Sequence, residues 1–107
     1  MDIQELRREA QTMQPQLTAD RRRLHRNPEA GAVLPETVAY VKERLTEMGY
    51  HPQELGGGLT ATVTGTDTGR CILLRADMDA LPIQEDHSDA PYCSKTAGVM
   101  HACGHDA

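Results

Sequence analysis

The last seven residues of the sequence, HACGHDA, hold its densest group of side chains that could do chemistry. His101, Cys103 and His105 alternate along this segment, so an extended backbone would place them on one face, and Gly104 would let the backbone approach a ligand closely. Neutral imidazole and thiolate are good ligands for zinc and other late first-row divalent metals. On a helix the same spacing would separate the side chains. The pattern therefore predicts a metal-binding segment with a non-helical backbone.

A second motif, LRADMDALP at residues 74–82, supports this prediction, since a short Cys-x-His pattern alone often arises by chance. Asp77 and Asp79 lie on the same side of the chain, just after an apolar run that is typical of a buried strand. Ligand sites of open α/β sheets collect at that end of the strands. Carboxylates there could ligate a metal, orient a ligating histidine or transfer protons. The alternative is an acidic strand exit that Pro82 ends.

Two amphipathic helices are predicted upstream of these motifs. Apolar residues recur at helical spacing from residue 2 to about residue 26, but Pro15 interrupts them and predicts either a kink or two helices in one phase. Residues 36–48 form the second predicted helix, because Pro35 suits the first helical position and Gly49 suits the C-terminal cap.

The remaining elements are two strands and a long loop. Residues 59–64 alternate as a half-buried strand does, and residues 71–76 form an apolar run that suits a buried strand beside it. The turn-forming segment 65–69 would join them as a hairpin of a larger sheet. Residues 78–99 show no period and predict a long ordered loop, a kind that tends to be functional. This order of elements indicates the opening of an α/β or α+β domain that is incomplete in these residues.

The composition of the 107 residues indicates a thin core. Ten Leu, three Ile and five Val supply the branched aliphatic side chains, with no Phe and no Trp, so we expect further chain to complete the core. A net charge of −5 argues against nucleic acid as a partner, and no apolar run approaches membrane-spanning length. The first residues lack the apolar core of a signal peptide, which favours the cytoplasm. Three cysteines do not form a disulfide framework, and Cys71 is expected to be buried in the predicted strand.

Three segments together resemble the M20 amidohydrolases of the aminoacylase, hippurate hydrolase and auxin-conjugate hydrolase type. They are LRADMDALPIQE at 74–85, GVMHACGHDA at 98–107 and RRLHRNPEAG at 22–31. The resemblance implies a zinc-peptidase-like α/β catalytic domain, of which residues 1–107 would be the N-terminal portion: two helices, then a strand hairpin of a larger sheet. The rest of that domain, and the inserted smaller domain associated with dimerisation and substrate closure, would lie outside these residues. A homo-oligomer is compatible with this resemblance.

The resemblance also implies roles for four residues. Cys103 matches a ligand that bridges two divalent ions, zinc or manganese, and His105 matches a ligand of one of them. Asp77 and Asp79 match acidic positions that support the metal centre. The implied reaction is hydrolysis of the amide bond of an N-acyl amino acid, a small-molecule substrate. The general-base Glu and the remaining ligands are expected beyond residue 107, so these residues contain no expected catalytic residue and should be inactive alone.

The other histidines have no predicted role in metal binding. His101 and Asp106 belong to the motif without a ligand role, His25 is expected to be structural, and His51 and His87 are expected to be exposed. Two other classes of protein remain as alternatives: a small metal-binding protein without catalysis, and an interaction protein that pairs through its first helix. The family-like spacing along the whole chain favours the enzyme.

Overall fold

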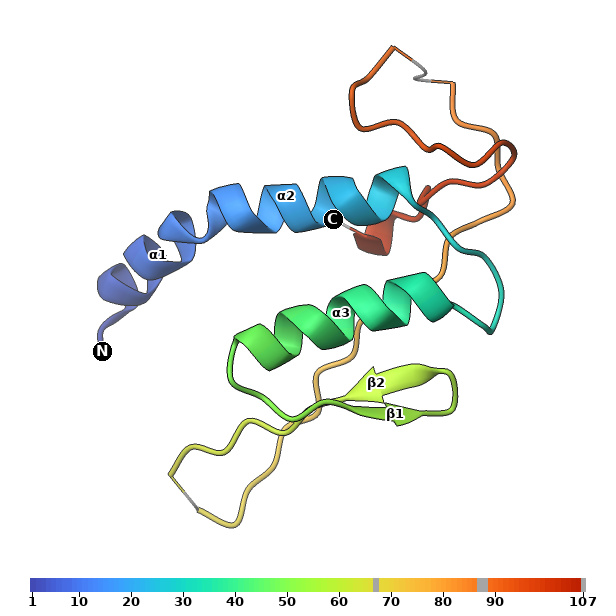
Figure 1. Ribbon diagram of the computed structural model, residues 1–107. Helices are drawn as coiled ribbons and strands as arrows, with labels where there is room; N and C mark the ends of the chain where they lie inside the picture. Colours follow the sequence, from blue (N-terminus) through green and yellow to red (C-terminus); the bar gives the residue numbers. More distant parts are fainter. Residues whose placement is uncertain (67, 87–88, 107) are drawn as a thin grey trace.

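In a computed structural model, helices and one β-hairpin form the regular structure of the described residues, 1–66, 68–86 and 89–106 (Figure 1). In chain order the elements are α1 (Ile3–Thr12), α2 (Gln14–Arg26), α3 (Pro35–Glu47), β1 (Gln53–Leu55), β2 (Gly58–Thr60) and the short 3-10 helix η1 (Gly104–Asp106). In these residues we find no helix both apolar and long enough to cross a membrane. Helices followed by a hairpin are the architecture that the sequence predicted.

Helices α1 and α2 replace the single long helical stripe, which confirms the two-helix alternative. Met13 ends α1 and begins α2 in helical geometry, and Pro15 occupies the first turn of α2, where its missing N–H costs no helical hydrogen bond. The two helices run nearly in line in Figure 1. Helix α2 ends at Asn27, just before Pro28.

Helix α3 forms where residues 36–48 predicted it. Its first turn contains Pro35, and Gly49 follows its end with a φ of +92°. The N-terminal N–H groups bond to a carboxylate from outside the helix: Glu29 accepts from the backbone of Thr37 at 2.6 Å and of Glu36 at 3.3 Å. Burial raises the pKa of Glu29, but these hydrogen bonds outweigh it and hold the pKa below its ordinary value.

Asp20 joins α2 to α3. Its carboxylate accepts from the Tyr40 hydroxyl at 2.6 Å and from Nε of Arg44 at 3.2 Å, and both donors belong to α3. The ring of Tyr40 is also covered by Arg23, whose guanidinium carbon lies 4.5 Å from the ring centroid. These polar contacts hold α2 and α3 side by side, at a junction to which few apolar side chains contribute.

The predicted hairpin was placed too far along the chain. β2 covers only the start of the predicted strand 59–64, and its antiparallel partner is β1 rather than residues 71–76. Leu55 pairs with Gly58, so Gly56 and Gly57 form a two-residue turn, both with positive φ. Such a turn favours a tight hairpin because glycine adopts left-handed geometry without steric cost.

Residues 71–76 are not a strand in this structure. Ile72 is 85% exposed and Leu74 is 90% exposed, and Cys71 is exposed too, which contradicts its predicted burial. An apolar strand needs neighbouring strands to pair its backbone and cover its side chains. Among the described residues no strand lies beside this segment.

The long loop predicted at 78–99 carries no helix or strand in its described residues, and hydrogen bonds tie it to the turn between α2 and α3. Ala80 donates to the carbonyl of Glu29 at 2.8 Å, and Leu81 exchanges two backbone bonds with Met100. The buried apolar residues lie around this junction: Leu34, Val38 and Ala80. The radius of gyration is 16.0 Å, against about 13 Å for a compact domain of this length, as the thin core predicts.

Candidate metal centre

The HACGHD motif (residues 101–106) brings its thiol and one imidazole together. Sγ of Cys103 lies 3.5 Å from Nδ1 of His105. The backbone is non-helical at Cys103, as predicted, but His105 lies in η1, so the prediction of a non-helical backbone is wrong there. The amide of Asp106 donates to the carbonyl of Cys103 at 3.1 Å and closes this single tight turn. The turn folds the two donor side chains toward each other.

His101 and Asp106 form a second pair, which the sequence did not single out. Nδ1 of His101 lies 3.8 Å from Oδ2 of Asp106. Both Nε2 of His101 and Oδ2 of Asp106 are buried, and neither has a hydrogen-bond partner among the described residues. Burial lowers the pKa of His101; His25 adds to this effect, and Asp106 and Asp79 oppose it. A neutral imidazole with a free buried nitrogen can accept a proton or bind a cation.

A cavity of about 370 Å³ lies next to this pair, between α2, α3 and the segment that enters the long loop. Asp77 borders it together with His101 and Asp106, whereas Cys103 and His105 are not among its lining residues. Its other walls are mainly apolar or basic: Leu17, Arg21, Leu24, His25, Thr37 and Met78. The structure thus brings Asp77 to the second pair of the motif rather than to the first.

The two acidic residues have different surroundings. Asp77 is exposed and accepts a hydrogen bond from Arg75 at 2.8 Å. Asp79 is exposed and lies near enough to His101 for its charge to raise the pKa of that imidazole. In residues 1–66, 68–86 and 89–106, no three His, Cys, Asp or Glu side chains are arranged to hold one metal ion. Among these described residues, Cys103 and His105 are the thiol and imidazole of the motif that the structure brings together.

His25 has a structural partner, as expected. Its Nε2 lies 2.7 Å from Oε1 of Glu85, and both side chains are about nine-tenths buried. Glu85 also accepts from the backbone N–H of Ser94 at 2.6 Å. The contact between His25 and Glu85 fixes the end of α2 against the long loop. The ring of His25 also lies 6.4 Å from that of His101, the first residue of the motif. His51 is exposed as predicted, and His87 lies outside the described residues.

Several known proteins are similar to this chain. Residues 73–107, which include both acidic residues and the motif, match the model of peptidase family M20/M25/M40. The N-acetyl-L-cysteine deacetylase of Bacillus subtilis (strain 168) is 46% identical over 97 residues, which are 89% of this chain and 23% of that protein. The N-acyl-L-amino acid amidohydrolase of Geobacillus stearothermophilus is 38% identical over 110 residues, 99% of this chain and 29% of that protein. The chain belongs to the M20 peptidase family.

Structural comparison supports the M20 assignment. The crystal structure of the Bacillus subtilis YXEP protein, a dinuclear metal binding peptidase from the M20 family, matches with a TM-score of 0.80 at 38% identity. The match covers 90% of this chain and 28% of that one. The chain therefore spans about a quarter of the length of the M20 proteins that it matches.

Proposed function

We propose that residues 1–107 form the N-terminal portion of the catalytic domain of a metal-dependent amidohydrolase that acts on N-acyl amino acids. The names of the bacterial relatives, a deacetylase of an N-acetyl amino acid and an N-acyl-L-amino acid amidohydrolase, support this substrate class. The observation that carries the proposal is the approach of Cys103 to His105 at 3.5 Å.

That separation fits two ligands of one metal ion. Around a tetrahedral zinc ion, a sulfur at about 2.3 Å and a nitrogen at about 2.0–2.1 Å lie roughly 3.6 Å apart. The Cys103 thiol and the His105 imidazole already have this spacing, and the contact between them also suits an S–H···N hydrogen bond whose proton a cation would replace. We propose Cys103 and His105 as ligands in a centre of two divalent ions, zinc or manganese.

The acidic residues support this centre in the proposal. Asp79 lies near His101, and Asp77 borders the same cavity as His101 and Asp106, so these carboxylates can hold imidazoles in place and balance the charge of a cation. A bound divalent ion would polarise an amide carbonyl as a Lewis acid. It would also lower the pKa of water, so that hydroxide could attack that carbonyl near neutral pH. The apolar wall that Leu17, Leu24 and Met78 form beside them would exclude bulk water from one side.

The described residues provide two of the proposed metal ligands, Cys103 and His105. A hydrolytic zinc site normally uses three protein ligands and one water, and two ligands do not meet that need. We propose that the general-base Glu and the remaining ligands come from beyond residue 107, and that the 107-residue chain alone does not hydrolyse amides.

A chimaera tests the proposal. Residues 1–107 would replace the matching quarter of the Bacillus subtilis N-acetyl-L-cysteine deacetylase, and hydrolysis of N-acetyl amino acids would be measured with zinc or manganese. We expect Cys103→Ala to abolish the activity of an active chimaera, whereas Cys71→Ala, at an exposed cysteine, should leave it intact. An active chimaera that tolerates Cys103→Ala would contradict the role of this thiol.

A further inference from the structure

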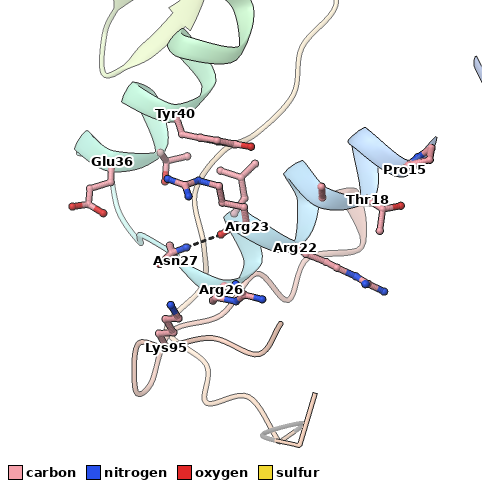
Figure 2. Close-up of a pocket in the computed structure, with 12 residues that line it drawn as sticks. Pro15, Thr18, Arg22, Arg23, Arg26, Asn27, Glu36, Tyr40 and Lys95 are labelled. Atoms are coloured by element: carbon pink, nitrogen blue, oxygen red, sulfur yellow. Dashed lines mark hydrogen bonds between the residues drawn. The ribbon is translucent and has the colours of Figure 1, made fainter. Parts of the chain in front are cut away.

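A second, larger cavity lies along α2. It measures about 650 Å³, and no residue of the motif lines it. Figure 2 shows that its lining comes from three parts of the chain: α2 along its length together with Asn27, which follows it, the first turns of α3, and Lys95 of the long loop. The cationic side chains that line it are Arg22, Arg23, Arg26 and Lys95, and the sole carboxylate among its lining residues is that of Glu36.

The three arginines are held by neutral groups. The guanidinium of Arg22 lies 4.6 Å from the ring centroid of Tyr92, and that of Arg23 covers Tyr40. Arg26 donates from Nη2 to the carbonyl of Pro91 at 2.9 Å. Such contacts restrict the side chains but leave their charge uncompensated.

Carboxylates do not neutralise this group, although the chain as a whole carries a net charge of −5. Within the part of the chain that the structure describes, none of the four cations forms an ion pair, while Lys42 and Arg44 on the neighbouring helix do. The negative end of the α2 dipole accounts for cations in its last turn. It does not account for Lys95, which the loop brings to the same cavity through a 2.9 Å bond from its backbone N–H to the carbonyl of Arg26.

We propose that this basic cavity binds a small oxyanion, a molecule that bears a phosphate or a carboxylate group. Guanidinium groups that rest on ring faces keep N–H edges free, and those edges match the oxygens of both groups. A volume of about 650 Å³ lies within the range of small-molecule sites. Arg22 and Arg23 each already cover one face of Tyr92 and Tyr40, which reduces the ring surface on which a nucleic-acid base could stack here and favours a small ligand over a polynucleotide.

Calorimetric titration of the 107-residue chain tests the proposal with pyrophosphate and glutarate as probes. We expect one of them to bind with a stoichiometry near one and to weaken as salt rises, because charge supplies the affinity. The stronger probe distinguishes a phosphate ligand from a carboxylate ligand. Lys95→Gln should weaken binding by about tenfold, the loss expected for one charge-assisted contact. The side chain of Lys95 is exposed, so this variant keeps the fold.

A second pair of variants separates the cavity from general electrostatics. Arg26→Gln with Lys95→Gln should abolish binding, whereas Arg7→Gln with Arg8→Gln removes the same charge from α1, outside the cavity, and should preserve it. Circular dichroism of each variant checks that the helices persist. Absence of binding by both probes, equal loss in both double variants, or tighter binding of single-stranded RNA than of either probe would overturn the proposal.

Discussion

Replacement of Glu85 by Ala should release the long loop from the end of α2. Glu85 is 8% exposed, and its carboxylate accepts from Ser94 at 2.6 Å and from His25 at 2.7 Å, across 9 and 60 positions of sequence. A hydrogen bond to a charged group contributes about 1.5–3 kcal/mol to stability. Because a backbone amide exchanges with solvent only when its bond opens, the Ser94 amide should exchange roughly 10- to 150-fold faster in Glu85→Ala.

Hydrogen–deuterium exchange followed by NMR measures this effect residue by residue. Amides in the middle of α3 serve as the internal reference, since equal acceleration there would indicate global unfolding. Glu85→Gln keeps an acceptor oxygen and loses the charge, so it should accelerate exchange less than Glu85→Ala. Asp86→Asn removes the charge of the exposed neighbouring carboxylate and should leave the Ser94 amide unchanged. An unchanged Ser94 amide in Glu85→Ala, or an equal effect of Asp86→Asn, would refute the role of this buried carboxylate.

Three further predictions concern the helix cap and the motif. Because the folded-state pKa of Glu29 lies below its unfolded value of 4.5, the carboxylate stabilises the fold above about pH 4.5 and loses that effect as pH falls through the folded-state pKa. Glu29→Gln should therefore lower the thermal midpoint at pH 7, because the free energy of unfolding falls by about 0.5–2 kcal/mol, and the difference from the wild type should vanish in acid. The exposed Glu43→Gln is the control. A difference between Glu29→Gln and the wild type that persists in acid would contradict the cap. Zinc titration of the 107-residue chain should show weak binding that Cys103→Ala removes and Cys71→Ala retains, and equal binding by the two variants would exclude the motif. Neither N-acetyl nor N-benzoyl amino acids should be hydrolysed by this chain with added zinc or manganese, and turnover that disappears in Cys103→Ala would show that the 107 residues suffice.

The elements that local sequence determines were predicted well. Helix α3 has its apolar period, a proline in its first turn and a glycine after its end within one short segment. Pro15 likewise divides the first helical stripe because the chemistry of one residue decides it. The Gly56-Gly57 turn was an equally local signal for the true hairpin. The predicted hairpin instead used the apolar run at 71–76, although a strand also depends on partners that composition does not reveal.

The sequence by itself determined the family and the candidate ligands, because the HACGHD and LRADMDALP segments carry their residue types at fixed spacing. Only the tertiary structure decided which groups meet. The tight turn of η1 folds Cys103 toward His105, whereas an extended segment was expected. The contact of His25 with Glu85 and the grouping of Lys95 with the arginines of α2 join residues about 60 to 70 positions apart. Such contacts depend on how the loop returns across α2, and the residues alone do not encode that path in any local pattern.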